Sequence, residues 1–316
     1  MDARRLALGL TLSTGLLGGC QRHLELHELD DPQAICNDGT PAGYYYRPGK
    51  SSRWLIYLEG GGFCDSVEEC DARTMDLQSS SAWPEELNPG GIFATDESTN
   101  PDFHDAHHVF LKYCSSDLWS GDRAAAPETG DRHFRGSRIL EAALDDLIDQ
   151  GYLEPSAGLD VLFAGTSAGG VGVLINLDRV KARLSPAKVR GLDDAGWLVD
   201  IPPFDPALGS YYERATAGVA FWGARVDESC ASEHPGDLGL CYLGEIAVAA
   251  LSAPIFIHVA QQDIVLLGYL GVDYPYLGDR AQYVNCTFGP AVRDSIADLD
   301  ATFSPVTWLP GLLSLA

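Results

Sequence analysis

Short apolar runs alternate along this chain with longer stretches in which apolar residues recur every three or four positions. Residues 54–58 form a continuous apolar run that ends at a glycine loop, residues 60–62, and residues 160–164 form a second such run. Runs of this length bounded by turn residues are typical of buried strands. Further short strands are expected at residues 109–111, 189–192 and 255–259.

Two segments have the spacing of amphipathic or buried helices, residues 137–150 and 168–184. Strands that alternate with helices favour an α/β fold with a mostly parallel central sheet and helices on both faces. The length of 316 residues suits a single large domain, which we expect over residues 36–316. Residues 65–107 are rich in turn-forming residues and predict a long excursion over the sheet edge.

The first twenty residues have the pattern of an export signal. Arg4 and Arg5 precede an apolar run over residues 6–17, and Cys20 follows two glycines. This pattern predicts a lipoprotein signal in which Cys20 is lipidated, with residues 21–35 as a tether. The alternative is an ordinary secretory signal with an incidental cysteine.

Export would place the seven remaining cysteines where disulfides persist. Cys64 with Cys70, and Cys230 with Cys241, are close enough in sequence to close small loops. Cys36 and Cys114 are further disulfide candidates, and the odd number leaves one thiol without a partner in the chain. No CxxC pair is present, so we expect neither a metal site nor another cofactor.

Acidic residues outnumber basic ones, 45 to 21, which gives a formal net charge of −24. Nucleic acid is therefore excluded as an expected partner, because its phosphates would be repelled. The same charge weighs mildly against a polyuronate substrate. Neither the acyl group of a substrate nor the oligomeric state follows from these numbers.

Residues 165–169 read Gly-Thr-Ser-Ala-Gly and lie between a predicted strand and a predicted helix. In that context G-x-S-x-G forms a tight turn that exposes a nucleophilic serine, here Ser167. The alternative is a small-residue turn that only permits close packing.

A nucleophilic serine needs two N–H donors for the oxyanion and an acid that orients its base. Ala168 supplies one donor, and Gly61 or Gly62 in the loop after the first strand supplies the other. The alternative for this loop is a turn that opens the excursion. Asp263, just past the strand at residues 255–259, is the favoured acid. Asp193 and Asp194 also follow a strand and are the rival candidates.

Several segments together resemble the pectin acetylesterase family, which includes the Notum-type carboxylesterases. The resemblance implies an α/β-hydrolase-like fold and a metal-free serine esterase that removes acyl groups from carbohydrate or from a lipidated protein. It implies Ser167 as nucleophile, Asp263 as acid, and the glycine loop with Ala168 as oxyanion hole. The matching segments are 54–64 (WLIYLEGGGFC), 112–117 (KYCSSD), 119–121 (WSG), 133–136 (HFRG), 165–170 (GTSAGG) and 194–196 (DAG).

The end of the chain departs from the family pattern. The family closes with Phe-Ser-Pro, a cysteine and then Ser-His, whereas residues 303–305 (FSP) are followed here by VTWLP. We therefore expect a C-terminus truncated or altered after Pro305, with the catalytic histidine missing and Cys286 left unpaired. His258 is expected to pack in the core of a strand. Five other histidines precede the acid or the serine in the wrong order: His104, His107, His108, His133 and His234.

These observations predict a cell-envelope serine carboxylesterase that removes acetyl or similar acyl groups from a carbohydrate or related ester. The alternative is a catalytically inactive envelope lipoprotein that binds an acylated or carbohydrate ligand. In that case Trp83, Trp119 and Trp222 are candidates to line the ligand groove. A structural lipoprotein without a ligand is a third, weaker interpretation.

Overall fold

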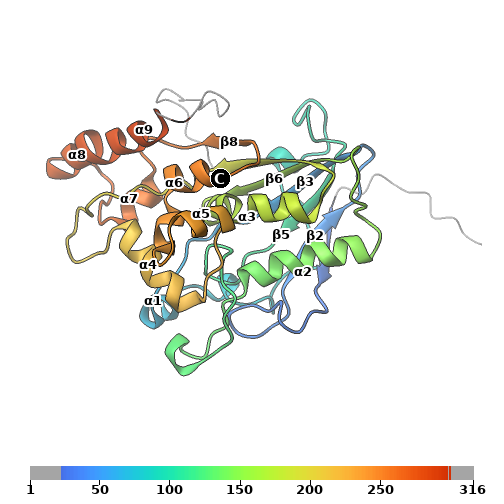
Figure 1. Ribbon diagram of the computed structural model, residues 1–316, viewed down its shortest axis with the longest axis horizontal. Helices are drawn as coiled ribbons and strands as arrows, with labels where there is room; N and C mark the ends of the chain where they lie inside the picture. Colours follow the sequence, from blue (N-terminus) through green and yellow to red (C-terminus); the bar gives the residue numbers. More distant parts are fainter. Residues whose placement is uncertain (1–22, 298, 300–316) are drawn as a thin grey trace, which may run out of the picture.

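The computed structural model describes residues 23–297 and residue 299. Its core is an eight-stranded sheet in the order β4-β1-β2-β5-β3-β6-β7-β8 (Figure 1). Neighbours from β5 to β8 pair in parallel, whereas β4, β1 and β2 add antiparallel strands on the other side of β5. The strands are β1 (Leu24–Glu28), β2 (Gly43–Arg47), β3 (Arg53–Leu58), β4 (Glu86–Leu87), β5 (His107–Leu111), β6 (Asp160–Thr166), β7 (Lys188–Asp194) and β8 (Ile255–His258).

Helices fill the connections between the parallel strands and the region after β7. The α-helices are α1 (Val67–Asp71), α2 (Gly136–Asp149), α3 (Ala168–Arg183), α4 (Tyr211–Trp222), α5 (Glu228–Glu233), α6 (Gly244–Ala250), α7 (Ile264–Tyr269), α8 (Asp279–Tyr283) and α9 (Gly289–Ala297). The shorter helical turns are η1 (Met75–Leu77), η2 (Gly91–Phe93), η3 (Pro127–Thr129), η4 (Leu238–Tyr242) and η5 (Val284–Phe288).

The two faces of the sheet are buried by different parts of the chain. Side chains alternate between faces along a strand, so Phe163 of β6 belongs to the large core that includes α2 and α3. Ala164 belongs to a second, smaller core on the opposite face, which Phe93 and Phe103 of the long excursion help to close. The predicted α/β architecture is therefore confirmed, and the expected strands and helices lie within a few residues of their predicted positions.

The segment predicted as a tether is partly a strand. Within residues 21–35, β1 pairs antiparallel with both β2 and β4, and Leu24 is fully buried. The interpretation of this segment as a tether was wrong because its polar residues hid an alternation of Leu24 and Leu26 with charged neighbours. The predicted signal and Cys20 lie outside the described residues.

Three disulfides link Cys36 with Cys114, Cys64 with Cys70, and Cys230 with Cys241. Among the described residues Cys286 is a free, exposed thiol, as the odd count predicted. The three bridges fit an extracellular protein. Within the described ranges, none of the helices has both the length and the apolar character needed to cross a membrane.

Trp119 and Trp222 are fully buried, so these two candidates for a ligand groove belong to the core instead. Each indole N–H donates to a backbone carbonyl: that of Trp222 to Cys64 at 2.7 Å and that of Trp119 to Glu59 at 3.0 Å. These tryptophans brace the start of the excursion from inside the core.

Candidate active site

Ser167 occupies a strained turn between β6 and α3. Its φ of 58° and ψ of −121° lie in a region that residues with a side chain rarely adopt. A Cβ at Gly165 would lie 2.2 Å from the carbonyl oxygen of Gly169, and a Cβ at Gly169 would lie 2.0 Å from that of Leu58. Both glycines of the G-x-S-x-G motif are therefore required by backbone packing.

The glycine loop after β3 lies directly against this turn. A Cβ at Gly60 would lie 2.6 Å from the carbonyl oxygen of Thr166 and 3.1 Å from the Cβ of Ser167. Gly61 and Gly62 both have positive φ values, 146° and 66°, which glycine adopts without steric cost. The structure thus brings together the predicted nucleophile and the predicted oxyanion loop.

Side chains hold the carbonyl groups of Glu59, Gly61 and Gly62, whereas the N–H groups of the glycine loop have no such partner among the described residues. In the part of the chain that the structure describes, the N–H groups of Gly60, Gly61 and Gly62 donate to no protein acceptor. A loop whose N–H donors are free while most of its carbonyls are already bonded is arranged to receive an anion. The bonds that hold the carbonyls are Trp119 Nε1 to Glu59 O at 3.0 Å, Arg73 Nη2 to Gly61 O at 2.7 Å, and Tyr113 Oη to Gly62 O at 3.0 Å.

The first residue of the loop is fixed through its carboxylate as well. Glu59 accepts from Lys112 Nζ at 2.6 Å and from the backbone N–H of Tyr113 at 2.8 Å. Both side chains of the Lys112–Glu59 ion pair are mostly buried. This pair ties the end of β3 to the end of β5, so the loop starts from a rigid position.

A chain of hydrogen bonds crosses the carboxyl ends of four strands beneath Ser167. The Tyr57 hydroxyl donates to Thr166 Oγ1 at 2.6 Å, and Thr166 donates to Asp194 Oδ2 at 2.9 Å. The other oxygen of Asp194 pairs with His258 Nδ1 at 2.7 Å. The backbone carbonyl of Asp194 accepts the N–H of Ser167 at 2.8 Å, so this chain supports the strained turn.

His258 does not pack in the core, and that expectation was wrong. It is the last residue of β8, and its side chain is 45% exposed. Its outward position follows from the alternation of β8, in which Phe256 points to the same side and is also exposed.

Asp193 immediately precedes Asp194 in β7, so its side chain points to the opposite face of the sheet, and it is fully buried. Its Oδ1 accepts from the Gly196 N–H at 2.8 Å, whereas its Oδ2 is buried without a partner among the described residues. Burial away from water raises the pKa of this carboxyl to about 7. Asp193 and Asp194 therefore brace the turn from two sides.

Asp263 lies at the start of α7. Its Oδ1 accepts from the N–H groups of Val265 and Leu266 at 2.8 and 2.9 Å, which caps the helix. The far end of α7 reaches the glycine loop, since a Cβ at Gly62 would lie 2.3 Å from the Tyr269 hydroxyl. The structure thus places α7 at the site, while the role of Asp263 as acid stays a prediction.

The residues that hold the glycine loop were not identified from the sequence. Lys112 and Tyr113 lie in a segment that contributed to the family resemblance, which was the available signal. Arg73 lies within a polar excursion and had no such signal.

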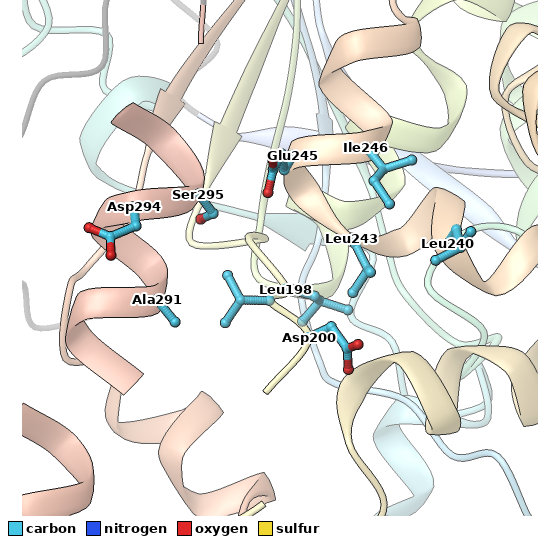
Figure 2. A pocket seen from close by; sticks show the side chains of 10 residues that line it. Leu198, Asp200, Leu240, Leu243, Glu245, Ile246, Ala291, Asp294 and Ser295 are labelled. Atoms are coloured by element: carbon cyan, nitrogen blue, oxygen red, sulfur yellow. The ribbon is translucent and has the colours of Figure 1, made fainter. Parts of the chain in front are cut away.

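A surface hollow of about 510 Å³ lies elsewhere, between α6, η4 and α9 (Figure 2). Leucine and isoleucine side chains form part of its wall, and Asp200, Glu245 and Asp294 contribute carboxylates. None of the predicted site residues lines it, so we do not assign it to the active site. Across the described ranges, no group of three or more histidine, cysteine or acidic side chains is placed to hold a metal ion.

Comparisons with known proteins agree with this geometry. The family model described as pectinacetylesterase matches residues 21–290. The palmitoleoyl-protein carboxylesterase NOTUM of Drosophila melanogaster is 36% identical over 301 residues, which cover 91% of this chain and 44% of the relative. Its human counterpart is 35% identical over 304 residues, which cover 89% and 60%. The chain thus spans about half the length of the curated relatives it matches.

A solved structure of the Wnt deacylase Notum from Drosophila superimposes with a TM-score of 0.83 at 33% identity, covering 88% of this chain and 82% of that one. The shared fold is α/β-hydrolase-like, as the family resemblance implied. Since the family model matches most of the chain and the relatives are more than 30% identical to it, the protein belongs to the pectinacetylesterase family.

Proposed function

We propose that this protein is a serine carboxylesterase in which Ser167 attacks the acyl carbon of an ester. The observation that carries the proposal is the contact between the strained turn at Ser167 and a glycine loop whose N–H groups are free. Strain of this kind persists where the surrounding structure holds it for function.

In the proposed reaction the Ser167 hydroxyl oxygen adds to the ester carbonyl, and negative charge develops on the carbonyl oxygen. The N–H groups of Ala168 and of Gly61 or Gly62 donate to that oxygen, and the amino-terminal end of α3 adds a favourable field. The bond from the acyl carbon to the alcohol oxygen breaks, and the alcohol leaves with the proton that Ser167 gives up. Water then adds to the acyl-enzyme, which releases the carboxylic acid and returns a proton to the Ser167 oxygen. Donors that are already oriented need no rearrangement as the charge forms.

The proposed site has an acid but no histidine base in the expected sequence order. Asp263 is proposed as the acid that orients the base, yet none of the eight histidines follows it in the sequence. Enzymes that lose triad members retain about 10³–10⁴-fold acceleration over water through the oxyanion hole and substrate binding. We therefore expect a slow but measurable esterase.

The proposed substrate is an acetyl or similarly small acyl ester on a carbohydrate or related alcohol. The family name supports an acetyl ester, whereas the relatives named above are carboxylesterases of palmitoleoylated protein. The net charge of −24 disfavours a polyanionic carrier.

The deciding experiment measures hydrolysis of p-nitrophenyl esters from acetate to octanoate by the chain without residues 1–20. Three forms are compared: the natural sequence, Ser167→Ala, and a form in which a Cys-x-Ser-His ending follows Pro305. Activity in the natural form that Ser167→Ala abolishes supports the proposal, and the preferred chain length identifies the acyl class. Activity only in the form with the added ending would mean that the natural sequence lacks a working general base. Equal background hydrolysis by all three forms rejects the proposal.

We also propose that the protein is exported and anchored by a lipid on Cys20, with residues 1–19 removed. The three disulfides support export. In bacterial cells producing the full chain, the natural protein should sediment with membranes and incorporate labelled palmitate. The Cys20→Ala form should do neither, and identical behaviour of the two forms would reject the anchor.

A further inference from the structure

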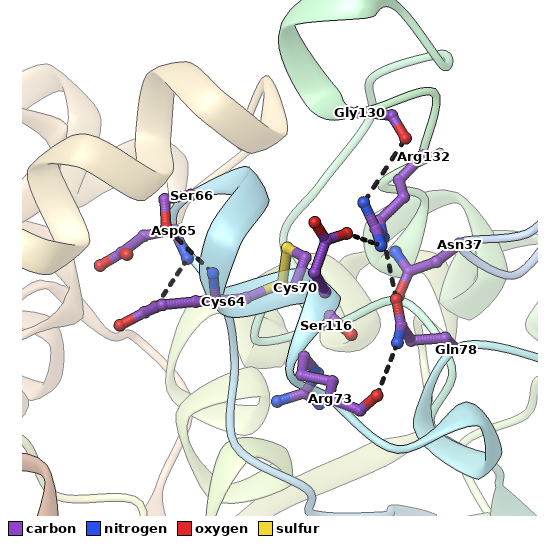
Figure 3. Close-up of a disulfide and its surroundings, with 12 residues drawn as sticks. Asn37, Cys64, Asp65, Ser66, Cys70, Arg73, Gln78, Ser116, Gly130 and Arg132 are labelled. Carbon is purple, nitrogen blue, oxygen red and sulfur yellow. Dashed lines mark hydrogen bonds and ion pairs between the residues drawn. A yellow bond between two sulfur atoms is a disulfide. The ribbon is translucent and has the colours of Figure 1, made fainter.

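Arg73 lies beside the glycine loop because a disulfide holds its segment there. The Cys64–Cys70 bridge ties α1 back to the end of the loop (Figure 3), and Arg73 follows α1 by two residues. Its Nη2 donates to the carbonyl oxygen of Gly61 at 2.7 Å. Its Nη1 lies 3.6 Å from the position that a Cβ of Gly62 would occupy. The guanidinium therefore runs along the peptide between Gly61 and Gly62.

The charge of this guanidinium is not neutralised by a nearby carboxylate. Among the described residues, no acidic oxygen lies within 4.0 Å of Arg73, whereas Arg135 is paired with Asp122 and Arg214 with Asp65. Arg179 is also partly buried without an ion pair within the described ranges, but its guanidinium donates to Ser137, Asn176 and the Val226 carbonyl. The Nε of Arg73 is buried and has no hydrogen-bond partner there. In a protein with a net charge of −24, an unpaired, partly buried cation at the proposed anion site needs an explanation.

Peptide geometry links this bond to catalysis. A trans peptide is planar, so the C=O of Gly61 and the N–H of Gly62 lie in one plane and point in opposite directions. Glycines on both sides allow that plane to rotate at little cost. A hydrogen bond from a charged donor, worth about 1.5–3 kcal/mol, opposes the rotation. Holding the carbonyl on Arg73 therefore aims the Gly62 N–H away from Arg73.

We propose that Arg73 is a positioning residue that orients the Gly62 N–H as an oxyanion donor and strengthens it by polarising the shared peptide. This inference rests on the proposed function, because it needs an oxyanion to form at Ser167. Arg73 itself does not touch the substrate in this scheme.

The chain offers a matched control in Arg132. Its Nε donates to Gln78 Oε1 at 2.9 Å, and the amide nitrogen of Gln78 donates to the Arg73 carbonyl at 3.1 Å (Figure 3). Arg132 also pairs with Asp71. It thus supports the same segment as Arg73 without contacting the glycine loop.

The test compares Arg73→Met, Arg73→Lys, Arg73→Ala and Arg132→Met in p-nitrophenyl acetate hydrolysis, with thermal unfolding of each variant. Loss of one oxyanion donor costs about 10²–10³ in kcat, and loss of its orientation should cost less. We expect Arg73→Met to lower kcat about 10–100-fold with KM changed less than about twofold. Arg73→Lys should recover part of kcat, and millimolar guanidinium should raise the kcat of Arg73→Ala. Arg132→Met should keep kcat within about twofold of the natural protein.

Two patterns of activity loss would overturn the inference, as would an unaffected Arg73→Met. One is an equal loss of kcat in Arg73→Met and Arg132→Met, which would mean that the segment matters only as structure. The other is a raised KM with unchanged kcat in Arg73→Met, together with no rescue of Arg73→Ala by guanidinium. Ser167→Ala, measured in parallel, separates the two proposals. If Ser167→Ala is inactive and Arg73→Met is unaffected, only the role of Arg73 fails; if Ser167→Ala retains full activity, the esterase proposal itself fails.

Discussion

The Nδ1 atom of His258 lies 2.7 Å from Oδ1 of Asp194, whose other oxygen accepts from Thr166, the residue before Ser167. The sheet order explains this arrangement, because β7 with Asp194 separates β8 from β6. Strands are about 4.8 Å apart, so His258 starts two strands away from the proposed nucleophile. Its ring is engaged by Asp194 and braces the hydrogen-bond chain below the turn.

His258→Gln should therefore leave esterase activity within about threefold, since glutamine can still donate to Asp194 and β7 lies between the strand of His258 and β6. Steady-state kinetics with p-nitrophenyl acetate would check this. A loss of a hundredfold or more, partly restored by added imidazole, would instead make His258 the base.

Replacing Ser167 by glycine should stabilise the protein while removing activity. Glycine relieves the strain at a φ of 58°, which costs on the order of 1–3 kcal/mol for other residues. Ser167→Ala keeps the strain and is the matched control. Denaturant unfolding should show the glycine variant about 1–2 kcal/mol more stable than the alanine variant. Equal stability would mean that the turn is relaxed in solution.

Gly165→Ala should destabilise the fold, because the new methyl group would lie 2.2 Å from the Gly169 carbonyl oxygen. Overpacking against backbone typically costs about 1–3 kcal/mol or more. Gly158→Ala is the control, since nothing lies within 4 Å of the added Cβ there; it should be neutral or stabilising by up to about 1 kcal/mol. Chemical denaturation compares the two, and similar effects would contradict close packing at the motif.

The buried carboxyl of Asp193 should make stability fall as the pH rises. Its pKa in the folded protein is about 7, against 3.8 as the ordinary value, so the folded state binds the proton more tightly than the unfolded state. The penalty is absent below pH 3.8, grows between pH 3.8 and 7, and is complete above pH 7. The advantage of Asp193→Asn over the natural protein should therefore increase by roughly 2–4 kcal/mol from pH 4 to pH 8. Parallel stability curves for the two proteins would refute this.

Removing the Cys36–Cys114 bridge by a double serine substitution should cost about 2–5 kcal/mol. The bridge closes a loop with a sequence separation of 78 residues, and its second cysteine follows Tyr113, which holds the glycine loop. Thermal unfolding of the double variant measures the cost. Cys286→Ser, which alters an exposed free thiol, should unfold like the natural protein, and a comparable loss there would point to Cys286 in an alternative bridge.

Local features of the sequence predicted much of the fold and the position of the serine turn. The apolar runs predicted β3, β5 and β6, and helical spacing predicted α2 and α3, because burial repeats with the period of each element. Gly165, Ser167 and Gly169 were readable for a similar reason, since a turn with that backbone admits few residue types. Weakly apolar strands such as β1 escaped because pairing with β2 and β4 stabilises them more than their own composition does.

The amino-acid sequence by itself determined which residues form the serine turn, because glycine spacing and strand-to-helix periodicity are local properties of the chain. Only the tertiary structure decided what surrounds that turn. Arg73 reaches the Gly61 carbonyl through a disulfide and a polar excursion, and His258 faces Asp194 instead of the core because of strand order and register. Such contacts depend on closing long loops over the sheet, and no local pattern of residues encodes where those loops come to rest.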